Sequence, residues 1–437
     1  MKENQNIEFK SSWRDEYLKW ICGFANAGGG RLYVGINDQG EVIGLSNYKT
    51  LAEEIPNKII SHLGVSCEIN LLEKNQIVYL EIVVPPYEVA ISFKGKYYFR
   101  SGSTLQELKG ISLNDFLMRK SGKTWDESID DSATIDELNP EAVNAFKSGA
   151  VKSYRLPNAG QEADLTKLLV NLRLMEGKNL KRAAILLFGK DPQKYHLTAY
   201  LKIGRFGVKD SDLLSQELIS GNIFEMADSA MEILDKKYFR KSISYNGLHR
   251  IETPEYPYEA VREILLNAIV HRHYSGPPIQ VSIYDDKFMV WNFGTLPENL
   301  TIEDLKRKHA SHPRNKLLAD LFFKGGLIEA WGRGTIKIIE ECEKAHLPKP
   351  IIEEMTGGIG VTLFNNWRAY LKLFNLNERQ ILAMEHFNEN DKITNKDYQK
   401  ITGASRETTS RDLADLTQKK LIESSGSKGA GSYYSKK

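Results

Sequence analysis

The stretch EAVREILLNAIVH, residues 259–271, predicts an amphipathic helix and carries more information than any other segment of the chain. Four polar side chains recur in it at every fourth position and form one stripe on an otherwise apolar helix: Glu259, Glu263, Asn267 and His271. A solvated face is the ordinary explanation of such a stripe. Asn267 weakens that explanation, because asparagine is a poor residue in mid-helix and Lys or Glu would suit solvation better. The stripe is therefore a candidate binding surface.

Two glycine-containing segments follow this helix. A hairpin predicted over residues 279–292 ends in Asn292-Phe-Gly294, where glycine lets the backbone approach a ligand. The segment GGLIEAWGRG, residues 325–334, then runs directly into a helix predicted over 335–345. A glycine-rich turn that leads into a helix N-terminus presents free N–H groups and the positive end of the helix dipole, which suits a phosphate group.

The order of these segments resembles the GHKL ATP-binding fold of gyrase and histidine kinases. It is more similar to the divergent, RecG-like C-terminal branch found in helicase-like regulators. Glu263-x-x-x-Asn267 matches the N box of that fold. The resemblance implies ATP and Mg²⁺ as cofactors, with Glu263 as the base that orients water and Asn267 as the Mg²⁺ ligand. Whether the ATP is hydrolysed stays open.

The same resemblance assigns the adenine and phosphate contacts. Asn292-x-Gly294 stands where the family reads adenine with Asp-x-Gly, and an asparagine carbonyl can still accept from the adenine amino group, without charge. The run Trp331-Gly332-x-Gly334 matches the second glycine box.

The resemblance also implies a lid over residues 309–315, with Arg314 as a candidate phosphate contact. GHKL domains often dimerise over bound ATP, so a homodimer is implied by family analogy. The run SGKT, residues 121–124, looks like the end of a P-loop. The earlier glycine would fall at Leu117, so no phosphate cradle can form there and no P-loop helicase is expected.

Residues 1–124 predict an α+β domain in which a helix over 13–27 ends at three glycines and a strand follows over 31–36. A succession of motifs in this segment resembles the AlbA-type domain of the Schlafen family over roughly residues 3–120: Glu3, Glu8-Phe-Lys10, FANAGGG at 24–30, Gly35-x-x-Asp38 and YFRSGS at 98–103.

In some Schlafen proteins this domain is a nuclease, and in bacterial ones it is usually taken to bind nucleic acid. The resemblance places Glu3, Glu8 and Asp38 where nuclease carboxylates would stand, and three carboxylates around a divalent cation could activate water. The alternative is structural, with Glu8 paired to Lys10 and Asp38 serving its turn. The candidate phosphate contacts are basic residues: Lys10, Lys94, Lys96 and Arg100.

Residues 371–437 predict three short helices followed by a hairpin. Ser405 caps the third helix, in which Leu413 and Leu416 face inward. This order resembles a winged helix-turn-helix. The resemblance implies DNA contacts from the start of the third helix and from the wing tip: Arg406, Thr409, Ser410, Arg411 and Lys428. Winged helices also dock proteins, and that alternative stays open.

Composition sets the class of protein. The 437 residues hold 59 Lys+Arg against 57 Asp+Glu and are 41% hydrophobic, which is typical of soluble globular proteins. The longest apolar run, residues 183–188, predicts a buried strand and is far shorter than a membrane span. The first residues are polar and the three cysteines lack CxxC spacing, so we expect a cytoplasmic protein that does not enter a membrane.

The sequence thus predicts an α+β multidomain protein. Its expected parts are an AlbA-type α+β domain at 1–124, a connector and start of the ATPase region at 125–250, a GHKL-like α/β sandwich at 251–366, and a winged helix at 371–437. The last part has a net charge of +3 and the rest −1, so DNA is expected at the C-terminal end.

The favoured interpretation is an ATP-binding, DNA-binding regulator of transcription whose nucleotide state controls its binding to nucleic acid. An ATP-controlled, metal-dependent nuclease acting on RNA or DNA in defence is the alternative. A scaffold with a vestigial nucleotide site is a third.

Overall fold

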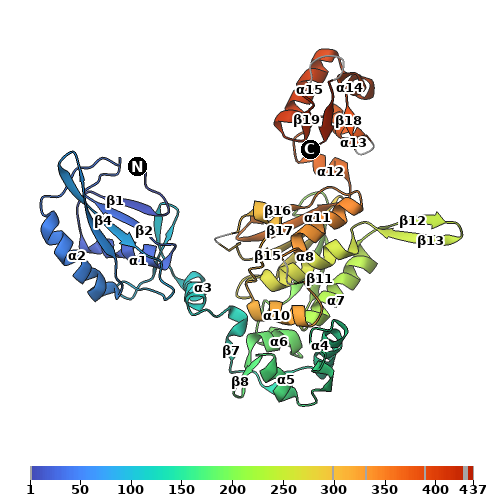
Figure 1. The fold of residues 1–437 in the computed structure, drawn as a ribbon. Coiled ribbons are helices and arrows are strands. Elements are labelled where there is room, and N and C mark those ends of the chain that lie inside the picture. The colour runs from blue at the N-terminus through green and yellow to red at the C-terminus, as the bar shows by residue number, and fades with distance from the viewer. Residues whose placement is uncertain (1, 298–299, 330–331, 388–389, 427–431, 437) are drawn as a thin grey trace. The chain divides into compact units, whose positions relative to one another are not determined.

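The computed structural model describes residues 2–297, 300–329, 332–387, 390–426 and 432–436, and Figure 1 draws it as a ribbon. The chain divides into two compact units, Met1–Trp125 and Asp126–Lys437. Both combine helices with sheets, which confirms the predicted α+β multidomain class. Within the described ranges, no helix has the length and apolar character needed to cross a bilayer.

The N-terminal unit is built on a four-stranded sheet in the order β1-β2-β4-β3. β1 runs parallel to β2, and the other two pairings are antiparallel. The strands of this unit, including a separate hairpin of β5 and β6, are β1 (Ile7–Lys10), β2 (Gly30–Val34), β3 (Glu68–Lys74), β4 (Ile77–Val84), β5 (Tyr98–Ser101) and β6 (Thr104–Glu107). Its helices are α1 (Leu18–Asn26), α2 (Tyr48–Leu63) and α3 (Gly110–Lys120).

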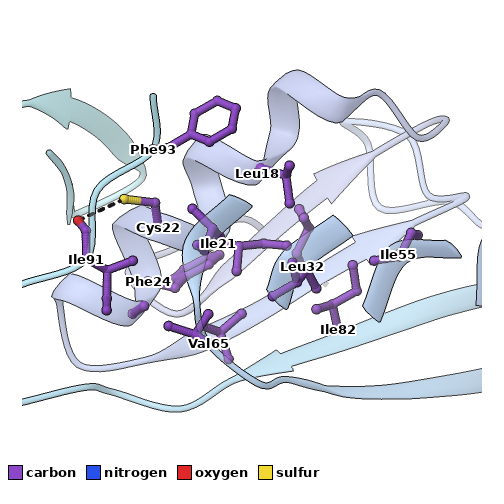
Figure 2. Close-up of a cluster of buried hydrophobic side chains, with 14 of the residues drawn as sticks. Leu18, Ile21, Cys22, Phe24, Leu32, Ile55, Val65, Ile82, Ile91 and Phe93 are labelled. Atoms are coloured by element: carbon purple, nitrogen blue, oxygen red, sulfur yellow. Dashed lines mark hydrogen bonds between the residues drawn. The ribbon is translucent and has the colours of Figure 1, made fainter. Parts of the chain in front are cut away.

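The core of this unit lies between α1, α2 and the sheet. Figure 2 shows Leu18, Ile21 and Phe24 of α1 facing side chains from the strands and from α2. The other core residues labelled there are Cys22, Leu32, Ile55, Val65, Ile82, Ile91 and Phe93. All are buried, so a continuous apolar layer fixes the position of α1 relative to β2.

Asn26, the polar residue of the FANAGGG motif, forms buried hydrogen bonds at the edge of this core. Its amide group donates to the carbonyls of Ile91 and Tyr98, both at 2.8 Å, and its side-chain oxygen accepts from the Ile91 N–H at 2.8 Å. The asparagine therefore ties α1 to β5 and to the segment before it. Because all of these groups are buried or half-buried, the motif has a structural role in this unit.

The C-terminal unit is built on a six-stranded mixed sheet in the order β11-β10-β14-β15-β17-β16. The strands are β10 (Leu201–Phe206), β11 (Leu213–Ile219), β14 (Ile279–Ile283), β15 (Lys287–Phe293), β16 (Ile351–Met355) and β17 (Gly358–Phe364). Three helices pack beside one another on it: α7 (Ile223–Ile233), α8 (Tyr258–His271) and α11 (Gly334–Lys344). Two strands of this sheet come from the segment before residue 251, so the sheet begins well inside the expected connector.

The remaining elements of this unit surround the sheet. They are α4 (Pro140–Lys152), α5 (Leu165–Asn171), α6 (Arg182–Phe188), α9 (Ile302–Leu305), α10 (Lys316–Lys324), the small sheet of β7 (Ile129–Asp130), β8 (Met175–Glu176) and β9 (Asn179–Lys181), and the hairpin β12 (Lys241–Asn246) and β13 (His249–Pro254). The predicted strand over residues 183–188 is wrong, because these residues form helix α6. All six are buried, and an apolar run buried on every side has no periodicity that separates helix from strand.

The last 70 residues or so form a small helical module with a three-stranded sheet. Its elements are α12 (Trp367–Lys372), α13 (Glu378–His386), β18 (Lys392–Ile393), α14 (Asn395–Thr402), α15 (Arg406–Gln418), β19 (Ile422–Ser424) and β20 (Tyr434–Lys436). α14 ends at Gly403, whose φ of 68° allows the sharp turn into α15, and the Ser405 side chain caps α15 by accepting from the Thr408 N–H.

Candidate nucleotide site and nucleic-acid interfaces

Helix α8 brings Glu263 and Asn267 together on the face that meets α11. The Asn267 side-chain amide donates to Glu263 Oε1 at 3.3 Å. Glu263 is 8% exposed, and burial raises its carboxyl pKa, with the positive charges of Lys337 and Arg262 opposing only part of the effect. A raised pKa moves a carboxylate toward the range in which a general base works well near neutral pH.

The start of α11 lies directly on these two side chains. A Cβ atom at Gly334 would overlap Glu263 Oε1 and would stand 3.2 Å from Asn267 Nδ2. The second glycine box therefore touches the N box, as the resemblance to the ATP-binding fold implies. Only glycine lets the two segments approach this closely, and in this conformation the backbone at Gly334 occupies the space in front of the carboxylate.

The N-terminus of α11 offers donors that the described residues do not use. Its N-cap residue, Arg333, makes no side-chain capping bond, and the buried Thr335 hydroxyl has no hydrogen-bond partner in the described part of the chain. Gly332 has a φ of 61°, and a Cβ there would overlap the carbonyl oxygen of His309. Free amides, an unused hydroxyl and a glycine turn fit a phosphate group.

Asn292 and Gly294 stand at the end of β15 next to this helix pair. Side chains alternate along a strand, so Asn292 shares a face with the buried Phe288 and Val290, and α8 contacts this strand. Gly294 has a φ of 123°, and a Cβ built on it would lie 3.1 Å from Arg314 Nε. The Arg314 guanidinium also donates to the Thr295 carbonyl at 2.8 Å. The structure thus places Arg314, of the predicted lid, against Gly294, of the predicted adenine motif.

His271, the last residue of the polar stripe, lies near the same arginine. Burial lowers the pKa of His271 to about 4, and the neighbouring charges of Arg314 and His309 add to the effect. The imidazole is therefore neutral at physiological pH. The four segments that carry the predicted nucleotide contacts, α8, the end of β15, the lid and the start of α11, thus converge in one region.

Three basic residues that the sequence analysis did not select hold this region together. Lys337 Nζ of α11 pairs with Glu259 Oε2 of α8 at 2.7 Å, and Arg262 donates to the Leu327 carbonyl at 2.8 Å. Arg155 donates to the carbonyl of Ile328 at 2.7 Å. Lys337 follows Gly334 by three residues, so helical spacing predicts that both lie on the same face of α11.

In the N-terminal unit, Glu8 forms a buried ionic cluster with two predicted phosphate contacts. Arg100 Nη1 lies 2.7 Å from Glu8 Oε2, and Lys10 is hydrogen-bonded to the other oxygen. Arg100 is fully buried, stacks over the rings of Trp20 and Phe24, and donates to the carbonyls that precede and begin β1. It has no surface to offer to a phosphate in this conformation, so the prediction of Arg100 as a phosphate contact does not fit the structure.

The three candidate nuclease carboxylates have separate roles. Glu3 Oε1 accepts from the Phe9 N–H at 3.0 Å, Glu8 is held by Lys10 and Arg100, and Asp38 is exposed in the turn after β2. Within the described ranges, no group of three His, Cys, Asp or Glu side chains is arranged to hold a metal ion. The carboxylates therefore do not form a metal centre in this conformation.

The two other predicted phosphate contacts of this unit are exposed. Lys94 lies over the ring of Phe93, and Lys96 pairs with Glu107 at 3.1 Å. Both can reach a phosphate without a change of fold.

In the C-terminal module, three of the five predicted DNA contacts are exposed along α15. They are Arg406, Ser410 and Arg411, while Thr409 is 0% exposed and points into the core with Leu413 and Leu416. Thr409 therefore cannot reach a groove in this conformation. Lys428 lies outside the described residues.

Two family models match the chain. Residues 3–109 match the family described as "Schlafen, AlbA_2", and residues 276–363 match "Putative ATP-dependent DNA helicase recG C-terminal". Residues 3–109 are thus similar to the Schlafen AlbA_2 family, and residues 276–363 are similar to the RecG C-terminal family. The RecG-like match begins after α8 ends, so it covers Asn292, Gly294 and the second glycine box but not the N-box pair. Together the two families support an ATP-binding, nucleic-acid-binding protein.

Six chains of known structure also match. One is the DIP2311 protein from Corynebacterium diphtheriae, 20% identical, with 99% of this chain and 92% of that chain covered and a TM-score of 0.47. Another is the N-terminal domain of a "Putative ATP-dependent DNA Helicase RecG-related Protein" from Nitrosomonas europaea, 23% identical, with 24% of this chain and 82% of that chain covered and a TM-score of 0.18. Comparison with curated proteins gives no match.

The buried Glu8–Arg100 pair of the N-terminal unit should be essential to the stability of that unit. Arg100→Ala leaves a buried carboxylate with one cation fewer, and breaking a buried ion pair in this way costs about 3–5 kcal/mol. Urea unfolding of the full chain measures this cost. Lys94→Ala, on an exposed lysine of the same domain, is the control and should change stability by less than about 0.5 kcal/mol. Equal effects of the two substitutions would contradict a structural role for Arg100.

Proposed function

We propose that this protein is an ATP-responsive, DNA-binding regulator of transcription. In this proposal Mg·ATP binds the RecG-like domain between α8 and the start of α11, and DNA binds the C-terminal module, which we take to be a winged helix. The observation that carries the proposal is the meeting of Glu263, Asn267 and Gly334 at a helix N-terminus with free donors. Burying the Glu263 carboxylate beside the half-buried Asn267 amide costs free energy, and packing of two helices alone would not require it.

Each nucleotide contact has a candidate on the described elements. Asn267 would ligate the Mg²⁺ ion, the α11 amides with Thr335 would hold phosphate oxygens, and Arg314 would add a positive charge. The Asn292 side chain would accept from the adenine amino group. Bound Mg²⁺ would neutralise phosphate charge, and Glu263 with its raised pKa would orient and deprotonate water if the ATP is hydrolysed.

Helix α11 gives the proposal a physical route from nucleotide to DNA. Its first residue, Gly334, rests on the N-box pair, so a nucleotide must displace this end of the helix to reach Asn267. Just beyond its other end, the His346 carbonyl accepts from Trp367 Nε1 at 3.0 Å, and Trp367 begins α12, which leads into the C-terminal module. A shift of α11 would therefore displace the start of α12. Coupling between the nucleotide site and the DNA site needs an element whose position depends on both sites, and α11 with the residues just after it contacts both ends of this route.

Gly334→Ala tests the proposed site directly. Its φ permits alanine, but the added Cβ overlaps Glu263 Oε1 and so displaces the carboxylate or the start of α11. We expect Mg·ATP affinity, measured by equilibrium dialysis with labelled ATP, to fall by at least about tenfold, the factor that 1.4 kcal/mol produces.

Gly28→Ala is the matched control, because its Cβ would meet no atom within 4 Å and its φ is also ordinary. It should leave ATP affinity unchanged. Equal ATP affinity in wild type and Gly334→Ala would refute the placement of the nucleotide between α8 and α11.

A further inference from the structure

The hairpin of β12 and β13 forms a projecting arm of the C-terminal unit. Every residue of both strands is exposed, including Ile243, Tyr245 and Ile251, and Leu248 at the tip is 100% exposed. Figure 1 shows the hairpin as a separate two-stranded ribbon that projects from the C-terminal unit. An isolated two-stranded hairpin has marginal stability in water. Four exposed apolar side chains on such a hairpin therefore indicate a surface that a binding partner covers.

The arm is firmly rooted. Phe239, directly before it, packs on Tyr256 and Phe288 with ring centroids 5.0 Å and 5.2 Å away, so the base of the hairpin is part of the sheet core. Arg240 and Lys241 pair with Asp285 and Asp235. A rooted arm presents its outer part in a defined direction, which a docking element needs.

A second unpartnered surface lies close to the root. β11 is an edge strand of the six-stranded sheet, and no described strand pairs with its outer edge. It exposes Leu213, Leu214 and Leu218, with Leu218 63% exposed. A long, apolar edge strand is a template for pairing with another strand, and natural proteins normally blunt or cover such edges. With seven residues, β11 is one residue longer than each six-residue strand of the arm.

Coverage decides among the possible pairings of these two surfaces. Pairing arm with arm would leave both β11 edges open, and pairing edge with edge would leave both arms exposed. Edge with edge would also bring like charges together, because residues 208–219 carry one basic and three acidic residues, a net charge of −2. Arm against edge covers both surfaces in one closed dimer and pairs exposed apolar residues on both sides.

Within one chain the root of the arm contacts β11 itself. Lys237 pairs with Glu217, and the Tyr238 and Ser215 hydroxyls lie 3.3 Å apart. Two surfaces so close together can both be satisfied around a single two-fold axis, with each arm on the other copy's edge. Nucleic acid is the less favoured partner, because Arg240, Lys241 and Arg250 each already have a carboxylate within 3.1 Å.

We propose that two copies of this chain associate by laying the β12–β13 arm of each copy on the β11 edge of the other. This association is separate from the dimer over bound ATP that family analogy implies, and it needs no nucleotide. Its failure would therefore leave the proposed nucleotide site untouched.

Trans cross-linking of the full chain tests this pairing without nucleotide. Ser244→Cys on the arm and Gln216→Cys on the edge are purified separately, mixed, and treated with a short bismaleimide. We expect covalent dimers in the mixture only. Wild type sets the background, since Cys22 and Cys342 are buried and Cys67 is half-buried. Cross-linking of either variant alone, or none in the mixture, would overturn the proposal.

Sedimentation equilibrium gives the second measurement. Leu248→Lys and Leu218→Lys should each raise the dimer dissociation constant by at least about tenfold, whereas Leu197→Lys, at an exposed leucine outside both surfaces, should not change it. A wild-type chain that sediments as a monomer at all concentrations would overturn the proposal. So would an arm variant that loses nucleic-acid affinity while its mass is unchanged, and that result would assign the arm to nucleic acid.

Discussion

We expect Asn267→Ala to remove the rise in melting temperature that, on the proposed function, Mg·ATP gives to the wild-type protein. Binding to the folded state alone stabilises a protein by RT ln(1 + [L]/Kd), about 2.7 kcal/mol at a ligand concentration of 100 Kd. Asn267 would be the ligand that ties the metal, and through it the phosphates, to α8. Alanine also leaves Glu263 Oε1 without its amide donor, so both functions of the pair are lost together.

Thermal unfolding with and without Mg·ATP measures this effect. Asn144→Ala is the matched control, the same substitution at an exposed position on helix α4 of the same unit, and it should keep the full nucleotide-dependent shift. An undiminished shift in Asn267→Ala would show that any nucleotide site lies elsewhere. The same shift with ATP and EDTA would argue against the metal role of Asn267.

We expect the double substitution Arg406→Ala with Arg411→Ala to weaken DNA binding by at least about tenfold and to lower the slope of log Kd against log salt by about 2, one for each phosphate contact removed. Both arginines are exposed on α15, and Arg411 has only a long pairing with Glu407, at 3.9 Å, to give up. Fluorescence anisotropy on a labelled mixed-sequence duplex over a series of salt concentrations gives both numbers.

The control removes the same net charge from another exposed region. Lys167→Ala with Lys178→Ala lies in the segment around α5 and should leave the salt slope unchanged. Equal losses in the two double variants would mean that bulk charge, and not α15, governs DNA binding. No loss in either would favour a protein-docking role for the C-terminal module.

The sequence alone predicts the features of the site that depend on local spacing. The stripe of Glu263 and Asn267 follows from helical periodicity, and the glycine turn before α11 follows from composition. Their meeting at Gly334 follows from neither, since it joins positions more than 60 residues apart. The resemblance to a nucleotide-binding fold supplied that expectation.

The role of Arg100 could not be predicted from sequence. It depends on a tertiary contact with Glu8, 92 residues away, and a basic residue on a short strand looks the same whether it faces solvent or a buried carboxylate. The prediction of a strand over residues 183–188 is wrong for a related reason. Burial on all sides removes the alternation that distinguishes a strand from a helix.

Two other features, the burial of Thr409 and the β12–β13 hairpin, can be predicted from patterns in the sequence. Thr409 shares a helical stripe with Leu413 and Leu416, which already places it on the buried side of α15. The run SISYNGLHRIE over residues 242–252 carries an Asn-Gly hairpin signal between alternating segments, and Gly247 in that turn has a φ of 61°.

DNA affinity measured with and without nucleotide tests the central claim most directly. The dissociation constant for the mixed-sequence duplex is determined at one fixed salt concentration, with saturating Mg·ATP and without it. If nucleotide controls DNA binding through α11, the two constants differ by at least about fivefold in the wild type, the lower end of typical coupling between sites, and coincide in Asn267→Ala. Equal constants in a wild-type protein that demonstrably binds Mg·ATP would contradict the account.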